Sequence, residues 1–191
     1  MGDGERPGET VSRRRLLAAA GGVAAGLAGL AGLAGCGSSA SPTPTNPEFN
    51  GADADVLDGL LGVGNRAVAA YARAAAVLGG APRALVRRIG VQEAAHVYAL
   101  TGAVDRLGGM PTPAPRAYAF TVRDASEALA LVAETEEMSI AAAIDALAKV
   151  TDHQARGTVV SIANNDAQHA MLIAQARGLP PLGAAIVRGR A

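Results

Sequence analysis

The stretch Gln92-Glu93-Ala94-Ala95-His96 lies inside a long helical pattern that covers residues 84–107. Apolar residues recur in this pattern every three or four positions, at Leu85, Ile89, Leu100, Ala103 and Leu107. Continuing the spacing places Glu93 and His96 one turn apart, on the face that we expect to be buried. Because burying ionisable groups is costly unless they are paired, the two residues indicate either a metal site or a core histidine bonded to a carboxylate.

The same periodicity predicts four helices in the chain. Their expected ranges are residues 53–78, 82–108, 125–150 and 151–177. Paired glycines end the first two helices, and capping-box patterns over residues 121–124 and 151–154 begin the last two. Alanine, leucine and valine dominate the apolar residues, which favours helices that pack closely together.

The lengths of the connections predict how the helices are arranged. The first and third connections are only a few residues long, so each should join an antiparallel pair of helices. The middle connection, residues 109–121, reaches roughly 40 Å at ~3.3 Å per residue. A helix of about 26 residues is also roughly 39 Å long. The sequence therefore predicts an all-α four-helix bundle with one long crossover over residues 53–178.

Three of the predicted helices place acidic or histidine side chains on their inner faces near mid-helix. Besides Glu93 and His96, these are Glu136 on the third helix and Asp166 with His169 on the fourth. Asp166 and His169 repeat the acid-x-x-His spacing of the second helix. We expect these groups to converge at one depth of the bundle. A network of core histidines bonded to carboxylates is the alternative to a metal site.

Two acid-x-x-His pairs and a lone acid between them resemble the ferritin-like carboxylate proteins, over residues 53–177. In that family four helices surround a pair of iron or manganese ions, and two of the helices carry a Glu-x-x-His motif. The resemblance implies metal ligands at Glu93, His96, Glu136, Asp166 and His169. It also implies iron or manganese as the cofactor, with oxidation of the metal or of a peroxide as the chemistry.

The sequence departs from the family pattern at two places. Asp166 stands where the family has Glu and is one methylene shorter. The first-helix position falls on Gly64, with Asn65 beside it, and neither residue supplies a carboxylate. Asp58 lies nearly two turns away from that position. With three carboxylates in place of four, the outcomes left open are one metal ion, an asymmetric pair with extra waters, or no metal.

The N-terminus has the features of an export signal. Arg13 and Arg14 precede an Ala/Gly/Leu run that extends to Leu33, a pattern that resembles a twin-arginine signal. The following Leu-Ala-Gly-Cys resembles a lipobox, which implies that Cys36 is the lipid-modified mature N-terminus. The alternatives are an ordinary cleavage site with a free thiol and an uncleaved anchor. We expect a signal peptide over residues 1–35, a flexible tether over 36–52 and a tail over 179–191.

The charge of the chain limits its partners. The formal net charge is zero, so the chain has no basic footprint for nucleic acid. The expected partners are the membrane, through the lipid anchor, and either a second copy or another envelope protein. Tyr71 and Tyr98 lie on or near inner faces in this prediction. The rivals to a metal protein are a non-catalytic, metal-free bundle and a protein that binds a small molecule in a cavity at Gly64.

Overall fold

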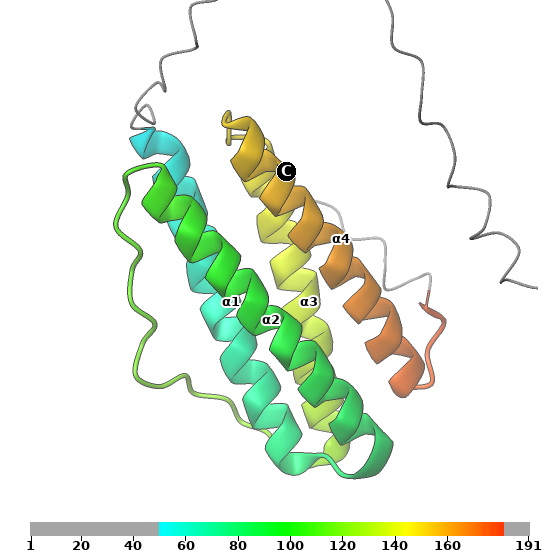
Figure 1. Ribbon diagram of the computed structural model, residues 1–191. Coiled ribbons are helices and arrows are strands. Elements are labelled where there is room, and N and C mark those ends of the chain that lie inside the picture. Colours follow the sequence, from blue (N-terminus) through cyan, green and yellow to red (C-terminus); the bar gives the residue numbers. More distant parts are fainter. Residues whose placement is uncertain (1–49, 182–191) are drawn as a thin grey trace, which may run out of the picture. The chain divides into compact units, whose positions relative to one another are not determined.

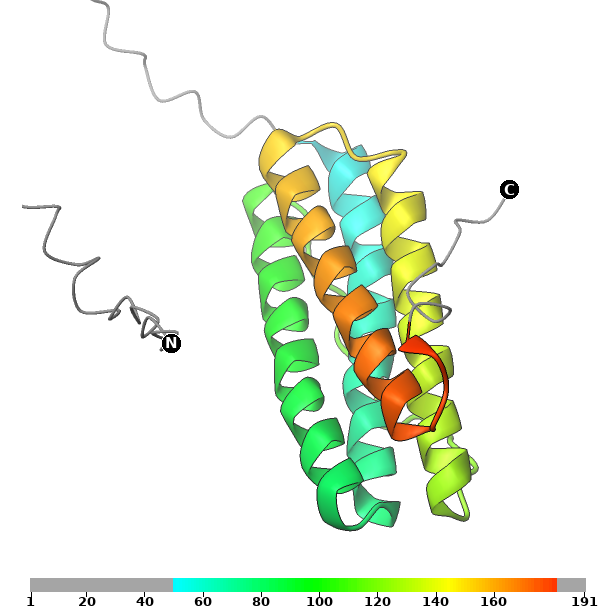
Figure 2. The same cartoon turned by 90° about the vertical axis from the view of Figure 1, so that its right-hand side faces the viewer.

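The computed structural model describes residues 50–181, and within that range every regular element is a helix. The helices are α1 (Gly51–Val77), α2 (Gly80–Arg106), α3 (Ala125–Leu147) and α4 (His153–Ala176). These four helices pack side by side into an all-α bundle (Figures 1 and 2). The predicted fold is confirmed, including two short connections and one long crossover. The glycines at positions 62 and 64 do not interrupt α1.

The helix starts differ from the predicted capping boxes. Asp124 caps α3 by accepting from the Glu127 amide, and Asp152 caps α4 by accepting from the Ala155 amide. The capping residue of α3 is therefore Asp124 and not Thr121, although α3 begins at Ala125 as predicted. Thr151 does not cap α4, because its hydroxyl and amide instead donate to the buried carboxylate of Asp53 on α1. A carboxylate at the N-terminus of a helix also interacts favourably with the helix dipole.

The long crossover runs along the bundle from the end of α2 to the start of α3, beside α1 (Figure 1). At one end, the Thr112 amide and hydroxyl donate to Asp58 at 2.7 and 2.6 Å. Further along, the Arg66 guanidinium lies 5.0 Å from the centre of the Phe120 ring. Arg73 then donates to a backbone carbonyl of the crossover at 2.6 Å. These anchors recur at seven- and eight-residue intervals on one face of α1.

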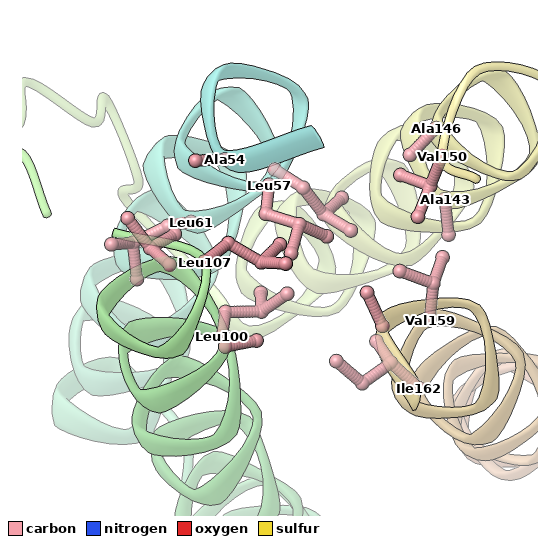
Figure 3. Packing of buried hydrophobic residues seen from close by; sticks show 14 residues of the cluster. Ala54, Leu57, Leu61, Leu100, Leu107, Ala143, Ala146, Val150, Val159 and Ile162 are labelled. Carbon is pink, nitrogen blue, oxygen red and sulfur yellow. The ribbon is translucent and has the colours of Figure 1, made fainter. Parts of the chain in front are cut away.

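The apolar core consists of two clusters. The first contains leucines, valines and alanines from all four helices, including Leu57, Leu100 and Val159 (Figure 3). The second contains Tyr71, Ile89 and other residues nearer the opposite end of α1. In α2, α3 and α4 the buried polar residues fall between these clusters in sequence. The bundle is therefore built as a polar layer between two apolar layers.

The structure shows the surroundings of two faces of α2. Tyr98 is 82% exposed, so its predicted place on or near an inner face is wrong. In addition, α2 and α4 approach each other much less closely than α1 and α2, α1 and α3, or α3 and α4. The contacts that do join α2 to α4 near mid-helix involve polar side chains.

The export and lipid-attachment predictions fall outside the described residues. The predicted signal peptide, Arg13, Arg14 and Cys36, most of the tether and the tail beyond residue 181 all lie there. The helix α1 begins at Gly51, two residues earlier than the predicted start of the first helix, so it includes the last two residues of the predicted tether. Among residues 50–181, no helix is long and apolar enough to cross a lipid bilayer.

Candidate metal centre

The five predicted metal ligands lie at one level of the bundle and come from three helices. Helix α2 provides Glu93 and His96, α3 provides Glu136, and α4 provides Asp166 and His169. Four of the five side chains are at most 2% exposed, and the His96 side chain is 13% exposed. The helical spacing of three residues places each acid beside its histidine on the inward face.

Four of these residues can hold a single ion. Glu93, Glu136, Asp166 and His169 each offer one ligand atom, and these atoms lie within 4.8 Å of one another. An ion bonded at about 2.1 Å separates opposite ligands by about 4.2 Å. Small side-chain movements are therefore enough to close these four groups around one ion.

His96 lies at the edge of the same cluster. Its Nδ1 atom is 3.3 Å from Asp166 Oδ1 and 3.6 Å from Glu93 Oε2. The rings of His96 and His169 are stacked with their centres 6.0 Å apart. The fifth predicted ligand is thus close to two of the other four without belonging to the tightest group.

Each histidine is oriented by an amide on the opposite helix. His169 Nε2 is 2.6 Å from Gln92 Oε1, and His96 Nε2 is 3.0 Å from Asn165 Oδ1. An amide oxygen can only accept, so each Nε2 carries the proton and each Nδ1 faces the carboxylates. This is the arrangement in which a partner across the ring orients a metal-binding histidine. Sequence reasoning did not assign Gln92 or Asn165, although each directly precedes the acid of an acid-x-x-His pair.

Helix α1 contributes a phenol instead of a carboxylate. Tyr71 is 2% exposed, and its hydroxyl donates a hydrogen bond to Glu136 Oε1. The close approach of α1 to α2 at this point favours Gly90, since a Cβ there would lie 3.3 Å from the Tyr71 Cβ, a tight contact. Sequence reasoning placed Tyr71 in the core but did not connect it to Glu136. The glycine on α2 was the signal that could have located the aromatic ring.

Seven buried polar atoms at this level have no hydrogen-bond partner among residues 50–181. They are Glu93 Oε1, His96 Nδ1, Glu136 Oε2, Ser139 Oγ, both carboxylate oxygens of Asp166, and His169 Nδ1. His169 Nδ1 is 3.0 Å from Glu93 Oε1, but the pair lacks hydrogen-bonding geometry. Buried polar atoms are normally paired, so a group of unpaired acceptors facing one another indicates a site for a cation.

The electrostatics of the cluster also favour a cation. Burial, together with the Glu93 and Glu136 carboxylates, raises the pKa of Asp166 to about 9. Burial would lower the pKa of His169, but its contacts with Glu136 and Glu93 outweigh burial and raise the pKa to about 9. Burial and the Glu93 charge also raise the pKa of Glu136. Without a metal, protons must therefore occupy the cluster at neutral pH.

One acid behaves differently from the other two. Burial opposes ionisation of Glu93, but the close approach of His169 and His96 on either side lowers its pKa. Glu93 is thus the carboxylate that stays ionised between two imidazoles. Burial, followed by the Glu136 charge, raises the pKa of Tyr71, so the phenol remains a proton donor.

The predicted first-helix position does lie against the cluster. Gly64 lines a cavity of about 10 Å³ together with Glu93, His96, Ser139, Asp166 and apolar neighbours. That volume is close to the minimum that holds one water molecule. The hypothesis of a small-molecule ligand in a cavity at Gly64 is therefore wrong. Asp58, nearly two turns from this position, accepts a hydrogen bond from the crossover instead.

Comparison with known proteins agrees with this architecture. A family model described as "Ferritin-like domain" matches residues 52–179. A conserved hypothetical protein from Mycobacterium tuberculosis superposes with a TM-score of 0.63 at 17% identity, covering 66% of this chain and 98% of that one. Ferritin-like diiron-carboxylate proteins from Bacillus anthracis give a TM-score of 0.56 at 19% identity, with coverage of 65% and 94%.

At these identities the two solved structures establish a shared fold. A search of curated proteins finds no significant match. The match to the family model spans well over half of the chain and includes all four helices and all five candidate ligands. The chain belongs to the ferritin-like domain family.

Proposed function

We propose that this protein binds iron or manganese in the polar layer of its bundle, as a redox-capable metal centre. The observation that carries the proposal is the set of seven unpaired polar atoms, all directed at one level among residues 50–181. Carboxylates with imidazole nitrogens and no thiolate are a donor set that suits iron and manganese. The diiron-carboxylate description of the Bacillus anthracis proteins supports the same choice.

Different residues of the chain would have different roles at such a centre. The carboxylates and the two Nδ1 atoms would hold the metal, and the metal would supply electron transfer. Gln92 and Asn165 keep the histidine protons on Nε2, away from the ligand atoms. Tyr71 holds a proton at Glu136 Oε1. The two apolar clusters on either side limit access of water to this layer.

A metal-free bundle is the second candidate, and one observation favours it. His169 lies within reach of both Glu93 and Glu136 and has a raised pKa. A protonated His169 would therefore form an internal ion pair with these acids. In this case the layer would serve only to fix the register of the helices.

Metal analysis separates these two functions. We expect the purified full-length protein to carry iron or manganese in stoichiometric amounts, and Glu136→Ala or His169→Ala to lose most of it. His153→Ala is the matched control, because His153 is exposed at the start of the same helix. Metal-free protein that chelator neither stabilises nor destabilises would support the structural role and contradict metal binding.

We further propose that the chain is exported and anchored to the cell membrane by a lipid on Cys36. Three features support this proposal, and they follow one another in the order expected of such a signal. They are the twin arginines Arg13 and Arg14, the weakly apolar run and the lipobox. Mass spectrometry of the protein from membranes should show an N-terminus at Cys36 with acyl chains. Replacing Arg13 and Arg14 with lysines should leave unprocessed precursor, and an intact N-terminus in the wild-type membrane fraction would contradict the proposal.

A further inference from the structure

We infer that the polar layer holds two unequal metal positions: a closed one beside His169 and an open one beside His96. In the open position, a water molecule held by Ser139 takes the place of the carboxylate that α1 lacks. This inference rests on the proposed metal-binding function. It adds which position binds tightly and where the exchangeable ligand lies.

The two histidine nitrogens mark the two positions. His169 Nδ1 is 3.0 Å from Glu93 Oε1, whereas His96 Nδ1 is 3.6 Å from Glu93 Oε2. Glu93 therefore presents a different oxygen to each histidine. Asp166 Oδ1 lies 3.3 Å from His96 Nδ1 and 3.9 Å from His169 Nδ1. The acids of α2 and α4 are thus shared by both positions.

The third carboxylate, Glu136, lies close to only one of the two metal positions. Glu136 Oε1 is 3.7 Å from His169 Nδ1, and Glu136 belongs to the four-residue group from which His96 is absent. One turn further along α3, the residue at the His96 side is Ser139. The α1 residues that line the same side are Leu60, Val63 and Gly64, and none of them carries a carboxylate. The position beside His96 therefore has no carboxylate of its own.

The missing group leaves a space of the right size for one water. The cavity of about 10 Å³ is bounded by Gly64, Ser139, His96 and the two shared acids. Ser139 is 6% exposed, and its Oγ has no hydrogen-bond partner in the described part of the chain. A water in this cavity would bond to Ser139 Oγ and to Asp166, whose oxygens are also unpaired. Ser139 is thus a positioning residue for an exchangeable ligand.

The charges of the three carboxylates predict that the two positions bind a divalent metal ion with different affinities. Three ionised carboxylates carry three negative charges, so one divalent ion leaves the layer with one negative charge. A second divalent ion leaves it with one positive charge in a buried environment, which is costly. We therefore expect the second ion to bind at least tenfold more weakly than the first. That difference corresponds to about 1.4 kcal/mol.

The test is a titration of chelator-treated full-length protein with Mn²⁺, followed by calorimetry and electron paramagnetic resonance. The wild type should bind one ion tightly, and a spin-coupled pair should appear only at least tenfold higher free Mn²⁺. Ser139→Asp supplies a carboxylate to the open position and should bring the second affinity within threefold of the first. Gly64→Glu supplies it from α1, in case Ser139→Asp fails to fold.

Ser126→Asp is the matched control, because it adds the same charge at an exposed position near the start of α3. It should leave both affinities unchanged. Two ions of equal affinity in the wild type would overturn the inference while upholding metal binding. One ion in the wild type and in both restoring variants would also overturn it. Absence of bound Mn²⁺ in the titration, together with absence of iron and manganese from the purified protein, would reject the proposed function itself and the inference with it.

Discussion

Glu136 illustrates at the residue scale how one contact determines what a buried acid can do. Its Oε1 atom accepts from Tyr71, while its Oε2 atom has no partner among residues 50–181. The phenol therefore leaves one oxygen free to bind a cation. Removing a donor from a buried acceptor costs more than the net value of the hydrogen bond, because the acceptor remains desolvated.

Tyr71→Phe should consequently destabilise the protein. We expect a loss of about 1–3 kcal/mol in the free energy of unfolding, which is the usual penalty for an unpaired buried polar group. Urea unfolding monitored by circular dichroism measures it. Tyr98→Phe is the control and should change stability by less than about 0.5 kcal/mol, since Tyr98 is 82% exposed. Equal stability of Tyr71→Phe and wild type would show that the Glu136 contact contributes nothing.

The amides that orient the histidines lead to a second prediction at this scale. Asn165→Ala and Gln92→Ala should weaken metal binding by about 10–100-fold, because the imidazoles lose the acceptor that fixes their tautomer. Competition with a coloured chelator measures the change. Gln168→Ala should have no effect, as Gln168 is exposed and bonds to the backbone of its own helix. A similar loss in all three variants would indicate general damage to the bundle and would contradict a specific role of the two amides.

Helical periodicity could identify the inward residues but could not identify their partners. Glu93 and His96 are three residues apart and share a face, whereas Tyr98 lies about 140° around the helix from Glu93. This angle places Tyr98 away from the inner face. The prediction that Tyr98 lies on or near that face was therefore wrong. By contrast, the contacts Tyr71–Glu136 and Asn165–His96 join different helices and depend on how those helices are shifted along their axes. The periodicity of a single helix carries no information about that shift.

At the scale of elements, the start of α1 is fastened to the link between α3 and α4. Asp53 is 2% exposed, and its carboxylate accepts from the Thr151 amide and hydroxyl and from the Asp152 amide at 2.7–3.3 Å. Asn50 caps α1 and also donates to the Thr151 hydroxyl. These contacts join residues about a hundred positions apart in the chain.

Asp53→Ala should leave several donors without their acceptor. We expect destabilisation of about 2 kcal/mol or more, because hydrogen bonds to charged groups contribute about 1.5–3 kcal/mol. Asp55→Ala is the matched control in the same helical turn, where the side chain is exposed. Urea midpoints compare the two variants. A larger effect of Asp55→Ala would mean that the dipole of α1, and not the hydrogen bonds of Asp53, accounts for the loss of stability.

Element order and connection type could be predicted, whereas the starts of α1, α2 and α4 each differ by two residues from the predicted ones. Lengths and turn signals are local properties, and they determined which helices form hairpins and that the middle link spans the bundle. The caps depend on competition between neighbouring polar residues. Thr151 is a suitable cap by type, yet its hydroxyl bonds to Asp53, a residue that is distant in sequence.

At the scale of the whole molecule, the polar layer links stability to pH. Asp166 and His169 each have a pKa of about 9 in the folded, metal-free protein, against ordinary values of 3.8 and 6.5. The folded state therefore holds more protons than the unfolded state. For His169 the stabilisation is complete below about pH 6.5 and is lost as the pH rises to about 9. For Asp166 the loss begins near pH 4 and ends near pH 9.

Chelator-treated protein should therefore become less stable from pH 6.5 to pH 9. Each group contributes a slope on the order of 1 kcal/mol per pH unit. Urea unfolding across this range measures the slope, and a His169→Gln variant should show a smaller one. Mn²⁺-loaded protein should lose less stability, because metal replaces the protons and binds more tightly at higher pH. A flat profile in the chelated protein would contradict the raised pKa values.

The loose approach of α2 to α4 has a consequence for how an ion reaches the layer. On this side the amide side chains of Gln92 and Asn165 contact the outer nitrogens of the two imidazoles, and Gln92 is exposed. We expect rotation of these two side chains to open a passage, so that the backbone stays folded while an ion enters or leaves. Turnover of bound metal should then proceed on the timescale of surface side-chain motion and stay insensitive to mild urea.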